Sequence, residues 1–149
     1  HSSFNRKVWR EYYLQSKFEK VLDYTARFEA FDDLPWLKED MIPLLDEKFP
    51  GSKFIYLIRE ESAWKNSMYN WKYKVTGTYP NVEEEWKKYK KHEKFVLNYF
   101  KDRPRNEFII IDVKEEKAFS KLATFLNKEA PQDDFPHFNK TSTDENKLR

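Results

Sequence analysis

The stretch Lys53-Phe54-Ile55-Tyr56-Leu57-Ile58-Arg59 decides the fold class of this chain. Its apolar run is typical of a parallel strand covered on both faces. The strand ends in a permanent cation, and Ser67 follows eight positions later. Ligands of open α/β sheets bind beyond the carboxyl ends of the strands, where an arginine offers donors that match phosphate oxygens. The stretch predicts an anion site, unless Arg59 pairs with Glu60, Glu61 or another carboxylate and Ser67 is an ordinary solvated serine.

The remaining segments predict helices around a second strand. Residues 108–113 form another buried apolar run, and Gly77 and Pro80 mark a loop. Amphipathic helices are expected within residues 6–27, from Asp40 to Pro50, from an N-cap at Ser62 to about residue 74, from Val82 to residue 100 and from Phe119 to Leu126. This order predicts an α/β fold with parallel pairing. Because two strands make a poor sheet, we expect further strands to complete it.

Composition limits the class of protein. The 149 residues are one domain's length, and 13 Phe, 9 Tyr and 5 Trp enlarge the apolar area available for a core. The formal charge of +2 gives no strong field that would select nucleic acid. No cysteine and no membrane-length apolar run is present, so we expect no disulfide, no membrane segment and a cytoplasmic location. Residues 141–149 are expected to be a flexible tail.

The sequence motifs around Arg59 resemble those of a known protein family. Residues 49–59, followed by Trp64 and Ser67, are similar to the second phosphate-binding motif of the sulfotransferase superfamily, in the branch that has "FPGSKFILTVRD…W…S" there. The usual aspartate after the arginine is replaced by Glu60. Residues 31–35 resemble the "D-x-P" element of that branch and residues 135–139 its "FPHxN" close, so three motifs occur in the expected order.

The resemblance implies a three-layer architecture like that of P-loop NTPases, with a parallel sheet flanked by helices. It implies an enzyme that transfers a sulfuryl group from 3′-phosphoadenosine 5′-phosphosulfate to a hydroxyl or amine. Arg59 and Ser67 would hold the 3′-phosphate of this donor, and Asp33 would accept the proton of the acceptor. The implied partners are the nucleotide and a small-molecule or glycan acceptor, with no metal.

The first motif of the family, a glycine-rich loop that cradles the 5′-phosphosulfate, has no counterpart here. The chain holds only Gly51 and Gly77. We therefore expect residues 1–149 to be the C-terminal part of a single sulfotransferase-like domain, or else a divergent relative that lost the loop. A non-catalytic interaction module on this scaffold, docking an acidic partner through Arg59 and lysine faces, is the alternative. A nucleotide kinase relative is disfavoured because Mg²⁺-binding signatures are lacking.

Several candidate residues have a second interpretation. Asp32 or Asp33 can simply start a turn before Pro35. His92 is expected to be solvated, whereas His137, within the "FPHxN" resemblance, has a better claim to lie near the cleft. The histidines are too scattered to predict a metal site.

Charged and aromatic residues near Ser67 also leave alternatives open. The run Lys87–His92 suggests a basic patch, but flanking glutamates favour a solvated, ion-paired helix face. Trp64 and Trp71 would stack on the adenine, line the acceptor cleft or pack in the core. Three lysines could help to hold the nucleotide or a sulfated acceptor: Lys65, Lys72 and Lys74.

Overall fold

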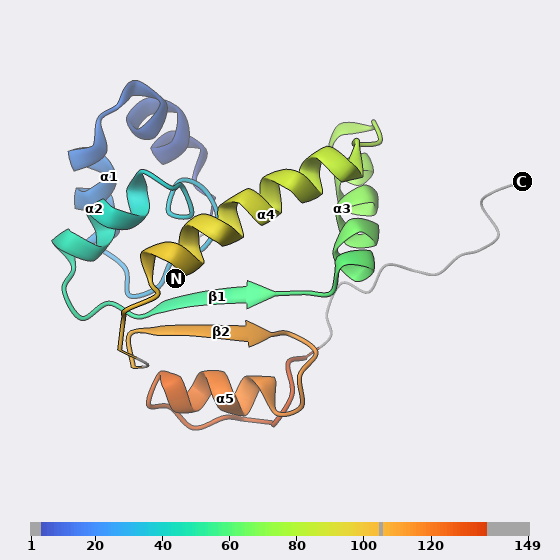
Figure 1. Ribbon diagram of the computed structural model, residues 1–149. Helices are drawn as coiled ribbons and strands as arrows, with labels where there is room; N and C mark the ends of the chain where they lie inside the picture. The colour runs from blue at the N-terminus through green and yellow to red at the C-terminus, as the bar shows by residue number, and fades with distance from the viewer. Residues whose placement is uncertain (1–3, 105, 137–149) are drawn as a thin grey trace, which may run out of the picture. The chain divides into compact units, whose positions relative to one another are not determined.

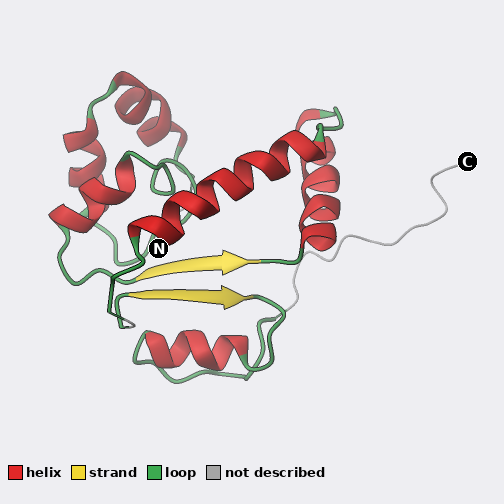
Figure 2. Ribbon diagram, viewed as in Figure 1, coloured by secondary structure: helices red, strands yellow, loops and turns green. Residues whose placement is uncertain are grey.

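The computed structural model describes residues 4–104 and 106–136. The described residues divide into two compact units, one that ends at Ser52 and one that begins at Lys53. In the first unit all the regular structure is helical, whereas the second contains both described strands (Figure 2). The single domain expected over residues 1–149 stays a prediction. The expected tail, residues 141–149, lies outside the described residues.

The first unit is a small helical assembly around one apolar cluster. A π-helical turn (Val8–Tyr12) and a 3₁₀ turn (Tyr13–Gln15) precede helices α1 (Phe18–Thr25) and α2 (Met41–Lys48). The helical spacing seen in the sequence brings one face of each element into a shared core. The buried members of this core are Val8, Val21, Leu22, Trp36, Met41 and Leu45.

Side-chain hydrogen bonds connect separate segments of the first unit. The indole N–H of Trp36 donates to the Thr25 hydroxyl at 2.8 Å, and both residues are buried. Helix α2 begins directly after Asp40, as predicted. The Asp40 carboxylate makes no capping bond and instead accepts from the Tyr13 hydroxyl at 2.9 Å. Burial and then this carboxylate raise the pKa of Tyr13 to about 12.

The second unit contains the predicted pair of parallel strands. Strand β1 (Phe54–Ile58) pairs with β2 (Phe108–Asp112), with Phe54 opposite Phe108 and Ile58 opposite Asp112. Helices α3 (Glu61–Thr76), α4 (Val82–Tyr99) and α5 (Ala118–Phe125) complete the unit. Figure 1 shows α4 on one side of the strands and α5 on the other. The arrangement is consistent with the predicted α/β class.

The two faces of β1 are buried to different extents. On one face, Phe54 packs on Phe100 at the end of α4, with ring centroids 4.6 Å apart. On the other face, Ile111 of β2 is fully buried, and its register partner Leu57 is 50% exposed. Ile55, on the same face, is 40% exposed. The prediction that this strand is covered on both faces is therefore wrong for the described residues, because α5 packs on β2 rather than on β1.

Replacing Thr25 with valine is expected to lower the free energy of unfolding by about 1–3 kcal/mol, since the buried Trp36 N–H loses its acceptor. Urea unfolding of the single variant measures this. In a Trp36→Phe background, which has no N–H to satisfy, the same Thr25→Val change should cost much less. Equal costs in both backgrounds would mean that the hydrogen bond does not stabilise the unit.

Candidate functional site

The site lies where β1 ends and α3 begins. Arg59 follows the last residue of β1, and α3 starts two residues later at Glu61. A cavity of about 270 Å³ is lined by Arg59, Trp64, Ser67, Met68 and Trp71. The four α3 residues among these occupy positions i, i+3, i+4 and i+7, so they share one face of the helix. The structure thus brings together Arg59 and Ser67, the two residues that the sequence analysis paired.

Arg59 is partly buried, and no ion pair joins it to a carboxylate in the part of the chain that the structure describes. Its Nε is buried and has no hydrogen-bond partner within residues 4–104 and 106–136. Glu61 pairs instead with Lys65 at 2.6 Å, and Glu60 caps α3. The alternative in which Glu60 or Glu61 neutralises Arg59 is therefore wrong. A buried donor without a partner marks a group available to a ligand.

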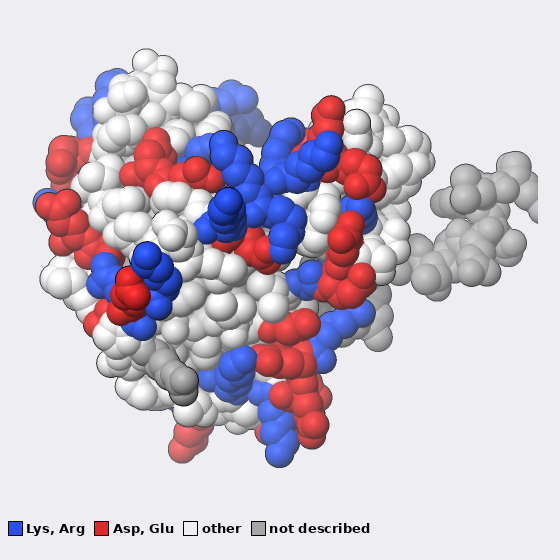
Figure 3. All heavy atoms as spheres, in the orientation of Figure 1, with Lys and Arg blue, Asp and Glu red and all other residues white. Residues whose placement is uncertain are grey.

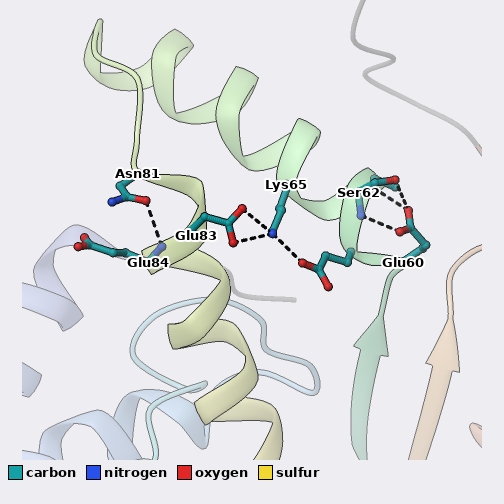
Figure 4. A network of polar contacts seen from close by, with 8 residues as sticks. Glu60, Ser62, Lys65, Asn81, Glu83 and Glu84 are labelled. Atoms are coloured by element: carbon teal, nitrogen blue, oxygen red, sulfur yellow. Dashed lines mark hydrogen bonds and ion pairs between the residues drawn. The ribbon is translucent and has the colours of Figure 1, made fainter.

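Glu60 closes the start of α3. Its carboxylate accepts the backbone N–H groups of Ser62 at 2.7 Å and Ala63 at 2.9 Å, and the Ser62 hydroxyl at 2.5 Å (Figure 4). The predicted cap, Ser62, thus lies inside the helix, because the longer Glu60 side chain reaches the same N–H groups. These hydrogen bonds, that of the Ser62 hydroxyl first, lower the pKa of Glu60 to about 2. Since a carboxylate already caps this helix, an anion would depend on the side chains of Arg59 and Ser67.

Aromatic side chains from α4 back the cavity. The Trp64 ring lies 5.3 Å from that of Trp86 and 5.1 Å from that of Tyr89. The Tyr56 and Tyr89 rings stack at 6.4 Å, and both hydroxyls are buried without a hydrogen bond of normal geometry. Burial raises the pKa of each tyrosine, so both phenols stay protonated at neutral pH. Sequence reasoning did not single out Tyr56 and Tyr89 as site residues, because the apolar patterns of β1 and α4 indicate only that these elements pack in a core.

Lys65 connects α3 to α4 rather than standing free at the cavity. Its ammonium lies 2.6 Å from Glu61 and 2.6 Å from Glu83 (Figure 4). Hydrogen bonds to these two glutamates raise its pKa, Glu61 first. The suggestion that Lys65 helps to hold a nucleotide is not supported, because both glutamates already engage its charge.

Two of the four lysines in the basic run on α4 form ion pairs within the helix. Lys88 pairs with Glu85 at 2.9 Å, and Lys90 pairs with Glu93. Figure 3 shows Lys or Arg side chains next to Asp or Glu side chains over this region. The solvated, ion-paired interpretation therefore describes these residues better than a basic patch for polyanions does.

Asp33 lies in the first unit and belongs to a turn. It is exposed, its φ is +63°, and its Oδ1 accepts the N–H of Leu34 at 2.7 Å. This geometry matches the turn that the sequence offered as the second interpretation. His92, expected to be solvated, is partly buried with its ring 6.1 Å from that of Tyr56. His137 lies outside the described residues.

Within residues 4–104 and 106–136, no group of three or more His, Asp or Glu side chains is arranged to hold a metal ion. None of the helices in these ranges has the length and apolar character needed to cross a bilayer.

Comparison with known families gives one match. The family model for the sulfotransferase domain matches residues 71–143. This match supports membership of the sulfotransferase superfamily. No curated protein and no solved structure matches it. The match starts after Ser67, so it confirms the resemblance from a part of the sulfotransferase domain that does not contain the Arg59 motif.

The Glu60 carboxylate that caps α3 makes the free energy of unfolding depend on pH. The pKa of Glu60 is about 2 in the folded chain and 4.5 ordinarily, so its contribution is complete above about pH 4.5 and is lost as the pH falls toward 2. We expect Glu60→Gln to be less stable than the wild type at pH 7, with the difference narrowing below pH 4.5. Urea unfolding at several pH values measures this difference.

Glu116→Gln is the matched control, because Glu116 is an exposed glutamate outside the helix caps. The difference in free energy of unfolding between Glu116→Gln and the wild type should not become smaller between pH 4.5 and pH 2. A Glu60→Gln difference that stayed constant from pH 7 to pH 2 would contradict the capping role.

Proposed function

We propose that this sulfotransferase domain uses 3′-phosphoadenosine 5′-phosphosulfate as donor and transfers its sulfuryl group to a hydroxyl or amine. The observation that supports the proposal is the shared cavity of Arg59 and Ser67, in which the guanidinium makes no ion pair with a carboxylate of the described residues. The family match supports the reaction class.

The cavity suits an anionic group of the donor. The guanidinium of Arg59 donates in a planar fork that matches two phosphate oxygens, and its Nε has no partner to give up. Ser67, two helical turns along from the start of α3, adds a hydroxyl on the same side. We assign the 3′-phosphate to this pair, as the motif resemblance implies.

The chemistry needs positioning and a proton acceptor. The acceptor oxygen or nitrogen forms a bond to sulfur, the bond from sulfur to the 5′-phosphate oxygen breaks, and 3′-phosphoadenosine 5′-phosphate leaves. Asp33 is our proposed base for the proton of the acceptor. One of its carboxylate oxygens serves the turn, and the other is our proposed site of protonation.

The Arg59→Ala variant is expected to bind 3′-phosphoadenosine 5′-phosphate about 10- to 150-fold more weakly than the wild type, because hydrogen bonds from charged groups contribute about 1.5–3 kcal/mol. Ser67→Ala should lose about fivefold. Calorimetric titration of the complete chain measures these affinities. Arg103→Ala is the matched control, since Arg103 precedes β2 and pairs with Glu107 at 3.4 Å. Equal affinities for wild type and Arg59→Ala would end the donor-site assignment.

Asparagine at position 33 separates the two interpretations of Asp33. It accepts the same backbone N–H and tolerates the same positive φ, but it takes no proton. We expect Asp33→Asn to retain the melting temperature and donor affinity while losing about 10²–10⁴-fold in kcat for sulfuryl transfer. Asp32→Asn is the neighbouring control. Full activity in Asp33→Asn would assign Asp33 to the turn alone.

The non-catalytic module remains the second candidate, because no carboxylate or histidine is among the described residues that line the cavity. Nucleotide binding that depends on Arg59, without transfer to any hydroxyl or amine acceptor, would favour it. A small-molecule or glycan acceptor and a cytoplasmic location stay predictions from the sequence.

A further inference from the structure

The second half of α3 and the turn that follows it expose large apolar side chains. The exposed residues are Tyr69, Trp71, Tyr73 and Val75 on the helix and Tyr79 in the turn that leads to α4. Val75 is 62% exposed and Tyr79 is 56% exposed. We call residues 69–81, which carry these side chains, the aromatic tip. Large apolar groups gathered on the surface of one segment mark a site of contact with a partner or a bilayer.

The apolar side chains of the aromatic tip lie on two sides of α3. Two residues along a helix turn by about 200°, so Trp71 and Val75 lie roughly opposite Tyr69 and Tyr73. Tyr79 stacks on both Tyr69 and Tyr73, with ring centroids 4.3 Å apart in each pair. A helix that packs only on its own domain needs one apolar side. Apolar side chains on both sides fit a segment that an apolar medium surrounds.

The charges along this part of the chain are all positive. Residues 62–82 contain no aspartate or glutamate, although the whole chain has 26 of them in 149 residues. Lys72 and Lys74 lie within the aromatic tip, and neither is paired with a carboxylate of the described residues. At the upper right of Figure 3, where Figure 1 places α3 and the turn after it, the surface includes a broad uncharged area. The local charge therefore suits an anionic surface.

The residue types of the aromatic tip favour a bilayer over a protein surface. Tyrosine and tryptophan combine an apolar ring with a polar group and are enriched where a membrane meets water. Lysine is depleted in protein interfaces, whereas at a bilayer its stem lies along apolar surface and its ammonium reaches the headgroups. A two-fold dimer through this surface would bring Lys72 and Lys74 toward the same lysines of the second copy. The charges therefore oppose self-association there.

The aromatic tip lies at the end of α3 that is remote from the strands. The helix has 16 residues and is therefore about 24 Å long. Figure 1 shows α3 starting at the end of β1, with the turn to α4 at its other end. Within the second unit, a flat partner can therefore reach the tip without meeting β1 or β2.

We propose that the aromatic tip docks this domain on an anionic lipid bilayer. The end of α3 points toward the lipid, and Trp71, Tyr73 and Val75 enter the region between the headgroups and the acyl chains. Lys72 and Lys74 contact anionic headgroups. The attachment is peripheral and reversible, because a few side chains supply it. This inference does not depend on which ligand the cavity at Arg59 binds.

Binding titrations of the complete chain with lipid vesicles, measured by co-sedimentation, test this proposal. The probes are vesicles of phosphatidylcholine alone and vesicles that also contain phosphatidylserine. We expect the wild type to bind the phosphatidylserine vesicles more tightly, with an affinity that falls as NaCl is raised. Replacing both Lys72 and Lys74 with glutamine should weaken this binding about 20- to 30-fold, since each lysine near an anionic bilayer contributes about fivefold.

The matched control replaces Lys87 and Lys91, two exposed lysines of α4 outside the aromatic tip, with glutamine. It removes the same charge and should weaken binding less than about threefold, because exposed charges beyond about 10 Å from the bilayer are screened. Val75→Glu tests the apolar contribution. It should weaken binding at least about tenfold, since it places a negative charge in the bilayer interface. Circular dichroism confirms that each variant is folded.

Tryptophan fluorescence measures whether the aromatic tip enters the lipid. Vesicles with brominated acyl chains should quench the emission of the wild type. Quenching should be much smaller in Trp71→Phe, which keeps an aromatic ring and still binds the vesicles, because the other four of the five tryptophans lie outside the tip.

Four results would overturn the proposal. The first is no binding of the wild type to phosphatidylserine vesicles at low salt. The second is equal weakening by the two pairs of lysine substitutions, which would assign the attraction to overall charge. The third is binding without Trp71 quenching that Val75→Glu leaves unchanged and that soluble polyglutamate reproduces, which would assign the tip to an acidic protein. The fourth is self-association that Val75→Glu abolishes, without vesicle binding, which would assign the tip to a second copy.

Discussion

The parallel pairing of β1 with β2 is the constraint on which the candidate site depends. Five residues of each strand pair in register, and aromatic contacts from Phe54 and Tyr56 hold β1 against α4. The direction of β1 and the point where it stops are therefore fixed. Arg59 follows that point directly, and the α3 face with Ser67 follows within the next two helical turns. The scaffold, rather than a long loop, places the guanidinium at the cavity.

Much of the second unit could be predicted from the sequence because its signals are local. Continuous apolar runs predicted both strands. Because helices separate the two strands in sequence, parallel pairing was expected. The eight-residue interval from Arg59 to Ser67 was enough to predict that they meet, since a strand end followed by a helix leaves little freedom. The prediction that Gly77 lies in a loop after the helix is confirmed, since Gly77 has a φ of +73° and ends α3.

Some features of the site could not be predicted, because two residues of similar chemistry could each have taken the same role, or one residue could have taken either of two roles. Glu60 and Ser62 both suit a helix cap, and only the reach of the longer side chain decides between them. Asp33 suits both a turn and a base, and its carboxylate is seen making the turn bond to Leu34. Trp64 and Trp71 share a helix face, but α4 covers one of them and not the other. These outcomes follow from tertiary contacts that no local pattern encodes.

The partly exposed Ile55 and Leu57 have a consequence for handling this chain. Within the described residues, β1 is hydrogen-bonded to β2 along one edge and to no strand along the other. An apolar edge of this kind is a template for strand addition between copies, and hence for aggregation at high concentration. Lys53 and Arg59 flank the segment in the sequence, but the Lys53 ammonium donates to the Phe125 carbonyl and the Arg59 Nε is buried. Neither charge therefore stands fully in solvent beside the exposed apolar residues to oppose such pairing.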